Sequence, residues 1–268
     1  MKTIRLIGLP TDINSSFERG AALAPAAIRA ALWSARGNLS CENGDEIGTD
    51  FQIDDCGDLP LTEDVEADDR LIMAAVSAGL QDGVTPLFLG GDHAVTLPIL
   101  QAMAAHHGPV SILHFDAHSD LYDDFEGNPR SHASPFARIM EQGLASRLVQ
   151  VGIRTSTRHC REQAERFGVE VFDMRHFMPE RVPVLSGKLY VSIDLDGIDP
   201  SEAPGVAHPE PGGLSLRSVL AVLDAQTAPI VGADIVELNP ARDRAAVTAI
   251  LAAKLVREVA SLIVRNAP

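Results

Sequence analysis

Short apolar runs alternate along the chain with longer amphipathic or alanine-rich stretches. Val, Ile and Phe in the short runs favour strands, and the longer stretches have the spacing of helices. We expect strands at residues 3–9, 51–54, 86–90, 110–116, 147–153, 169–173, 188–196 and 230–238. We expect helices at residues 23–35, 64–81, 94–106, 132–144, 158–167, 215–225 and 242–265. This alternation is typical of βα units and predicts an α/β fold with a mostly parallel sheet of about eight strands.

No linker, charge block or internal repeat interrupts the alternation. We therefore expect residues 1–268 to form a single domain, since a chain of this length with 46% hydrophobic residues can bury a sizeable core. The N-terminal segment MKTIRLIGLP has only a short apolar run, and about 18 consecutive apolar residues occur nowhere. These features indicate neither a signal peptide nor a membrane-spanning helix, so we expect a cytoplasmic enzyme.

The chain is acidic, with a formal net charge of −15. Such a charge repels nucleic acid and acidic membrane surfaces. It either favours the approach of a cationic small molecule or simply gives a solubilising surface. The three cysteines, Cys41, Cys56 and Cys160, are far apart and outside any CxxC spacing. We therefore expect buried free thiols rather than disulfides or a thiolate metal site.

Polar side chains gather where four of the expected strands end. The segments are GGDH (90–93), HFDAHSD (114–120), DLDGIDP (194–200) and the end of the strand at 230–238, which carries Glu237. In open α/β sheets, ligands bind beyond the carboxyl ends of the strands. We therefore expect these four segments to converge on one edge of the sheet.

The converging side chains have the chemistry of metal ligands. In an extended backbone, a period of two places His114, Asp116, His118 and Asp120 on one face, and Asp194 and Asp196 on another. The candidate ligands are His93, Asp116, His118, Asp120, Asp194 and Asp196. Four carboxylates carry four negative charges, so two divalent cations neutralise them, and the absence of thiolate favours manganese over structural zinc. Two such ions can bridge a water and lower its pKa toward neutrality, which predicts hydrolysis.

Each motif alone also has a structural interpretation, because an aspartate at a strand end often caps the next helix and GGDH is compatible with a simple turn. Three motifs with complementary ligands on one edge favour the metal site. We expect His114 to be a packed histidine or a hydrogen-bond partner of a ligand, and Asp92 and Asp199 to be turn acceptors. We expect HPEPGG (208–213) to form a rigid loop, with His208 as a candidate for the wall of the cleft.

Four motifs, GGDH (90–93), DAHSD (116–120), SIDLDGIDPSEAPG (192–205) and GADIVELNP (232–240), resemble the signatures of the ureohydrolase family, the binuclear manganese arginases and agmatinases. The resemblance covers nearly the whole chain. Segments such as NSSFERGAALAPAAIRAALW and YDDFEGNPRSHASPFARIME are most similar to the plant-type, agmatinase-like arginases. The resemblance implies a three-layer α/β/α fold, a homo-oligomer of three or six chains, and conversion of a guanidino substrate to urea and an amine by a metal-bridging hydroxide.

The resemblance also implies a role for each site residue. His93, Asp116, Asp120 and Asp194 are the expected ligands of one manganese ion, and His118, Asp116, Asp194 and Asp196 those of the other. Glu237 is expected to bind the guanidinium, and His132 to deliver a proton to the departing amine. Asp120 is expected to accept or hold the proton of the nucleophile.

The substrate is open among L-arginine, the first expectation, agmatine and other guanidino acids. Animal-type arginases bind the amino-acid head of the substrate with residues at two positions that this chain fills with Tyr122 and the segment TST (155–157). The head-group contacts of those enzymes therefore cannot be assigned to this chain. Two other functional classes are alternatives to a ureohydrolase. An inactive metal-binding protein of this fold predicts broken ligands, and none of the six is broken. The second is a fold-related deacetylase, which uses a single zinc ion. The full set of four aspartates disfavours this alternative.

Overall fold

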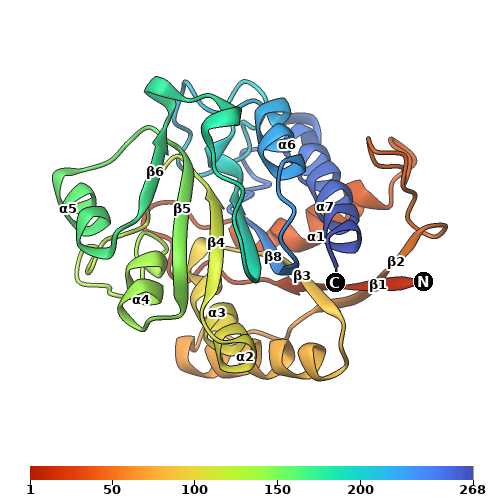
Figure 1. The fold of residues 1–268 in the computed structure, drawn as a ribbon, viewed down its shortest axis with the longest axis horizontal. Coiled ribbons are helices and arrows are strands. Elements are labelled where there is room, and N and C mark those ends of the chain that lie inside the picture. Colours follow the sequence, from red (N-terminus) through yellow and green to blue (C-terminus); the bar gives the residue numbers. More distant parts are fainter. Residues whose placement is uncertain (268) are drawn as a thin grey trace.

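Eight parallel strands form one sheet in the computed structural model, which describes residues 1–267 (Figure 1). The strands are β1 (Lys2–Leu9), β2 (Phe51–Asp58), β3 (Thr85–Gly90), β4 (Val110–Phe115), β5 (Ala145–Ile153), β6 (Glu170–Asp173), β7 (Leu189–Asp194) and β8 (Ile230–Val236). Their order in the sheet is β2-β1-β3-β8-β7-β4-β5-β6, and each neighbouring pair is parallel. The predicted fold class is therefore confirmed.

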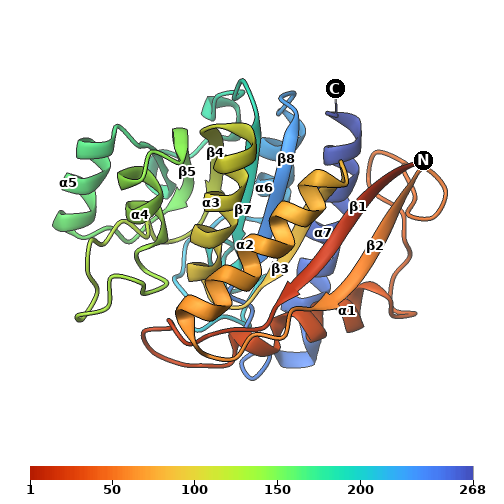
Figure 2. The same ribbon diagram turned by 90° about the horizontal axis from the view of Figure 1, so that it is seen from below.

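Helices cover both faces of this sheet (Figures 1 and 2). They are α1 (Ala24–Leu32), α2 (Val65–Gln81), α3 (Thr96–His107), α4 (Pro135–Glu141), α5 (Arg158–Phe167), α6 (Leu216–Asp224) and α7 (Val247–Arg265). Side chains of α1, α6 and α7 join one apolar core, and those of α2 to α5 join a second core on the opposite face. The central strands β4 and β7 are buried along their whole length, because parallel sheets are covered on both sides.

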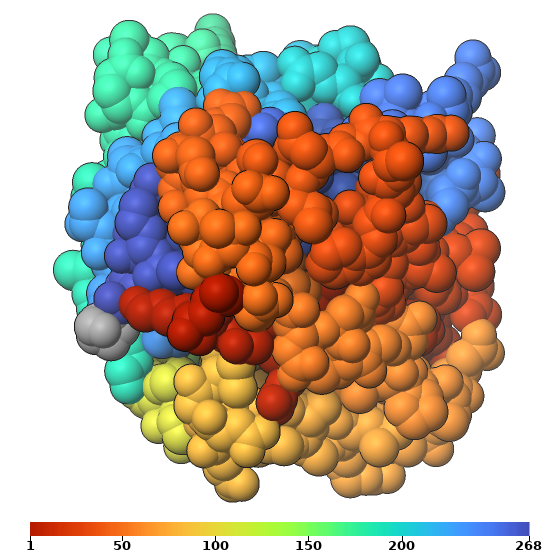
Figure 3. All heavy atoms as spheres, turned by 90° about the vertical axis from the view of Figure 1, so that its right-hand side faces the viewer, coloured from red at the N-terminus to blue at the C-terminus, as the bar shows by residue number. Residues whose placement is uncertain are grey.

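The expected elements are all present, with shifted ends. β2 runs to Asp58, four residues past the expected 51–54. The sequence pattern missed these residues because β2 is an edge strand, and its largely exposed acidic side chains lack the apolar pattern of a buried strand. Seen from the β2 side, the first quarter of the chain, in red to orange, covers much of the molecule (Figure 3). α4 begins at Pro135 rather than at residue 132, since proline suits the first turn of a helix and lacks the N–H needed further along.

Cys41 and Cys160 are buried as expected, but Cys56 is exposed, because it lies on the edge strand β2. All three thiols are free. Across residues 1–267, the helices fall short of the length and apolarity that crossing a bilayer requires.

Candidate metal centre

The chain turns sharply at the carboxyl ends of β4 and β7. β4 ends at Phe115, and the Asp116 Oδ1 atom then accepts the His118 amide at 2.6 Å. β7 ends at Asp194, whose Oδ1 accepts the Asp196 amide at 2.8 Å at the start of a 3-10 turn. The expectation of an extended backbone through 114–120 and 188–196 is therefore wrong. Aspartate carboxylates that accept an amide two residues on close turns instead, and these turns draw the same side chains together.

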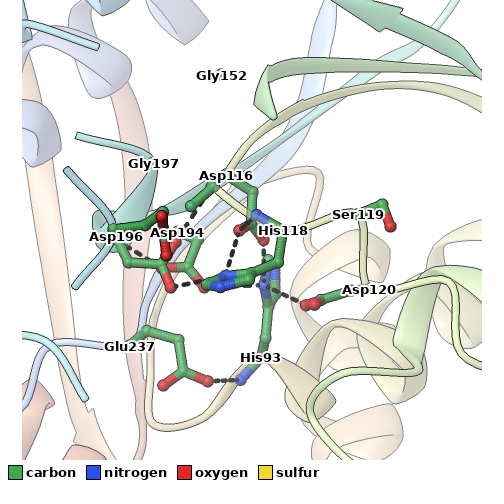
Figure 4. A network of polar contacts seen from close by, with 12 residues as sticks. His93, Asp116, His118, Ser119, Asp120, Gly152, Asp194, Asp196, Gly197 and Glu237 are labelled. Carbon is green, nitrogen blue, oxygen red and sulfur yellow. Dashed lines mark hydrogen bonds and ion pairs between the residues drawn. The ribbon is translucent and has the colours of Figure 1, made fainter. Parts of the chain in front are cut away.

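His93 faces three of the aspartates (Figure 4). It opens a 3-10 turn after β3, and its side chain is fully buried. The Nδ1 atom lies 3.3 Å from Asp116 Oδ2, 3.1 Å from Asp120 Oδ2 and 3.2 Å from Asp194 Oδ2. No described group makes a hydrogen bond of good geometry to this Nδ1. A buried ring nitrogen without a partner, facing three carboxylate oxygens, fits a site for a divalent cation.

A second group of donors adjoins the first. His118 Nδ1 lies 3.0 Å from Asp196 Oδ2 and 3.4 Å from Asp116 Oδ1. Asp116 therefore turns one oxygen toward His93 and the other toward His118, as a residue shared by two ions would. These three donors, Asp116, His118 and Asp196, lie close enough to one another to hold a single ion. For Asp194, the fourth ligand that the resemblance implies, Oδ2 faces His93 and Oδ1 accepts the Asp196 amide.

The four aspartates are buried beside one another and are costly to ionise together. Burial, together with nearby Asp196 and Asp116, raises the pKa of Asp194 well above its ordinary value. Burial also raises the pKa of Asp196 to about 6, although His118 opposes it. Burial acts in the same direction on Asp116, but the hydrogen bond from His114 and the nearby His118 ring outweigh it and hold the pKa of Asp116 well below its usual range. Bound cations would favour the ionised form of all four.

His114 contacts a candidate ligand rather than completing the ligand set. Its Nε2 lies 2.8 Å from Asp116 Oδ2, and Gln150 Nε2 donates to its Nδ1 at 3.0 Å. The ring also stacks on Phe136, with centroids 3.9 Å apart. Although His114 lies within reach of a cation near His93 and Asp116, both of its nitrogens already have partners. These contacts agree with the expectation of a packed hydrogen-bond partner.

Glu237 and His132 form a buried pair beside this cluster. Glu237 directly follows β8, with a φ of 69° that non-glycine residues adopt only at a cost. Its Oε1 accepts the His93 amide at 2.8 Å and the His132 Nδ1–H at 2.8 Å. The Ser16 amide donates to His132 Nε2 at 3.0 Å. Burial lowers the pKa of His132, but the Glu237 carboxylate outweighs burial and raises it to about 9.

A cavity of about 150 Å³ opens above these groups. It is lined by Ser16, His118, Ser119, Asp120, Tyr122, Phe125, His132, Ala133, Thr155, Thr157, Cys160, Asp194, Asp196, His208 and Glu237. His208 stands in the wall as expected, its ring centroid 5.2 Å from that of His132 and 6.1 Å from that of His118. Sequence reasoning gave no role to Ser16, Phe125 or Cys160. Ser16 and Phe125 lie in segments that carry the family resemblance, but each of the three residues reaches the cavity only through the folding of its loop or helix.

Comparison with known proteins gives consistent results. The model of the Arginase family matches residues 2–261. The protein "Arginase 1, mitochondrial" of Arabidopsis thaliana is 48% identical over 96% of this chain and 80% of its own length. The structure "Arginase from Medicago truncatula" is 45% identical with a TM-score of 0.92, over 98% of this chain and 87% of that one. "Agmatinase, mitochondrial" of Gallus gallus is 35% identical over 94% of this chain and 78% of its own length.

These relatives overturn the expectation of a cytoplasmic location. The plant arginases are named mitochondrial, or chloroplastic and mitochondrial, which points to an organelle. The expectation was wrong because location is set by an address that receptors read, and the hydrophobic pattern of a folded domain does not carry that address.

Proposed function

The chain belongs to the arginase family, and we propose that it hydrolyses L-arginine to L-ornithine and urea at the cavity above Glu237. As a member of this family it is a metal-dependent hydrolase of a guanidino carbon–nitrogen bond. The observation that carries the proposal is the buried Glu237 carboxylate, which lies beside the His and Asp cluster and faces the cavity. A guanidinium is a permanent cation and a poor electrophile, so it needs a fixed carboxylate to hold its carbon near a nucleophile.

We propose that two manganese ions bind at the cluster, one beside His93 and the other beside His118. The six donors are imidazoles and carboxylates, which suit this metal. The ligand sets are those implied by the motifs, with Asp116 and Asp194 shared between the ions. When bound, such ions would make hydroxide available at neutral pH. Asp120, which lines the cavity, is the proposed acceptor or holder of the nucleophile's proton.

Glu237 is the proposed guanidinium partner. Both hydrogen bonds of its carboxylate fall on Oε1, and among the described residues none reaches Oε2. The carboxylate is therefore held from one side while its second oxygen is available to a cation in the cavity. The left-handed backbone at Glu237 supports this role, because such conformations gather at functional sites.

His132 is the proposed proton donor to the departing amine. With a pKa raised to about 9 by Glu237, it carries a proton at neutral pH. Ser16 can serve both protonation states, since its amide donates to a neutral Nε2 and its Oγ, at 2.8 Å, can accept from a protonated one. Because Glu237 engages the Nδ1–H, the proton on Nε2 is the one we propose to pass to the amine.

Part of the cavity lining supports L-arginine over agmatine. The lining includes Tyr122, Thr155 and Thr157, which are uncharged hydroxyl residues, and within residues 1–267 it includes no carboxylate besides the metal cluster and Glu237. Hydroxyls can hydrogen-bond both the carboxylate and the ammonium of an amino-acid head. The lone terminal ammonium of agmatine would instead require a carboxylate partner to offset its desolvation.

Urea release tests this assignment. The manganese-loaded protein is assayed in parallel with L-arginine, agmatine, guanidinobutyrate and guanidinopropionate. We expect urea chiefly from L-arginine. Preference for agmatine would change the substrate but leave the chemistry in place, and absence of urea from all four would contradict the enzyme assignment.

Two further points of organisation are proposals. We propose that the 268 residues act as one domain, supported by a sheet and two cores that draw on the whole sequence. We also propose a homo-oligomer of three or six chains, supported by family resemblance. Light scattering after size-exclusion chromatography measures the oligomer, and a monomer at micromolar concentration would contradict it.

A further inference from the structure

A chain of buried hydrogen bonds lies behind His93, on the side of the ring away from the aspartates. His93 Nε2 is 2.9 Å from Ser192 Oγ, and Ser192 Oγ donates to Asp234 Oδ1 at 2.6 Å. Ser192 and Asp234 are direct neighbours in the parallel register of β7 and β8. All three side chains are fully buried, so water does not substitute for any of these contacts.

The direction of each hydrogen bond follows from Asp234. Its Oδ2 accepts from Tyr190 at 2.7 Å and from Thr96 at 2.8 Å, and its Oδ1 accepts from Ser192. A carboxylate has no proton to give, so all three hydroxyls must donate. Ser192 has a single hydrogen and gives it to Asp234. Its oxygen can therefore only accept from His93, which places the ring proton of His93 on Nε2.

This tautomer leaves the lone pair of His93 on Nδ1, the atom that faces Asp116, Asp120 and Asp194. The opposite tautomer would need Ser192 to turn its hydrogen toward His93. Asp234 Oδ1 would then lose the one donor that reaches it among the described residues. Leaving a buried carboxylate oxygen without a donor is costly, so the arrangement resists reversal.

We propose that Asp234 and Ser192 are positioning residues that fix the tautomer and ring orientation of His93, so that Nδ1 is ready to bind a cation. The inference rests on the two-ion centre of the proposed function. His118 has no such support, because its side chain is partly exposed and its Nε2 makes no hydrogen bond within residues 1–267. The two ions are therefore held unequally, and a change at Ser192 should affect only the one beside His93.

The proposal is tested by measuring the affinity of the full-length protein for manganese. The protein competes with a chelator for the metal, and electron paramagnetic resonance measures the free Mn²⁺. We expect the wild type to bind two ions per chain. In Ser192→Ala, one of the two affinities should fall about 10–100-fold, as is typical when a partner of a metal-ligating histidine is removed, and the other should stay unchanged. Asp234→Asn should weaken the same site, so the test stands even if one variant fails to fold.

Two comparisons separate positioning from a general loss of structure. Tyr190→Phe removes a donor from the other oxygen of Asp234 and leaves Ser192 in place, so it should lower the melting temperature without changing either affinity. Adding Asp234→Asn to Ser192→Ala should cause no further loss of manganese affinity, because Asp234 acts through Ser192.

Unchanged affinities in both single variants, or equal weakening of both ions, would overturn the inference. A wild-type protein that binds fewer than two ions would contradict the proposed metal centre itself, which makes the two failures distinguishable.

Discussion

Glu237→Gln is the substitution that separates charge from shape at the cavity floor. Oε1 of Glu237 accepts two N–H groups, from the His93 backbone and from His132. The amide oxygen of a glutamine must keep that position, since an NH₂ group there would face two donors. The NH₂ group is then forced into the position of Oε2, where it points a donor at the N–H groups of the guanidinium. The variant is thus both uncharged and mismatched to the substrate.

The size of the effect follows from the burial of the site. Glu237 is 4% exposed, and two unit charges about 4 Å apart attract by about 4 kcal/mol at an effective dielectric constant of about 20. Since about 1.4 kcal/mol corresponds to a tenfold change, kcat/KM for L-arginine should fall by about a thousandfold. Steady-state urea release measures this loss, and metal analysis verifies that the variant keeps its manganese.

Glu202→Gln is a matched control, because Glu202 Oε2 accepts a backbone amide, that of Leu216, outside the cavity lining. It should leave kcat/KM unchanged. If Glu237→Gln kept its metals and turned over L-arginine at the wild-type rate, Glu237 would not be the guanidinium partner.

Three other predictions concern stability. His132 has a pKa raised to about 9, above its ordinary value of about 6.5, so its pairing with Glu237 stabilises the metal-free protein fully below about pH 6.5 and this contribution disappears as pH rises through about 9. The difference in unfolding free energy between wild type and His132→Asn, measured by urea melts, should therefore shrink by about 3 kcal/mol over that range. A difference that does not depend on pH would contradict the pairing. Arg154 donates to the backbone carbonyls of Asp196, Gly197 and Glu210. Arg154→Met leaves these acceptors without their donor and should lower the free energy of unfolding by about 3 kcal/mol. An unchanged urea midpoint would show that Arg154 does not stabilise these loops. Chelation of the metal should lower the melting temperature, since saturation at about 100 times Kd contributes about 2.7 kcal/mol per ion, and equal melting curves with and without chelator would argue against a bound ion.

The fold was predictable because its strands are covered on both faces. β3, β4 and β7 are nearly continuous apolar runs, and the helices between them are separated by clear turns. The extent of β2 was not predictable in this way. It lies at the edge of the sheet, so its exposed acidic residues hide the strand from a pattern based on burial.

The candidate ligands were identified because parallel strands end at a common edge, and a cluster of carboxylates there requires positive charge. The path of the backbone was not predictable from the same pattern. Asp120 and Glu237 have φ values of 50° and 69°, conformations that local sequence disfavours and that only the surrounding contacts impose. Ser16 is 116 residues from His132, so its contact with the imidazole depends on tertiary folding. The roles assigned to these residues stay predictions.

The two-ion site is tested most directly by titrating metal-free protein with manganese and measuring urea release from L-arginine at each ratio of ion to chain. Because Asp116 turns one oxygen toward His93 and the other toward His118, we predict that activity depends on both positions and reaches its maximum at two ions per chain. Full activity at one ion per chain would contradict a catalytic two-ion site, and no urea at any loading would contradict arginine hydrolysis.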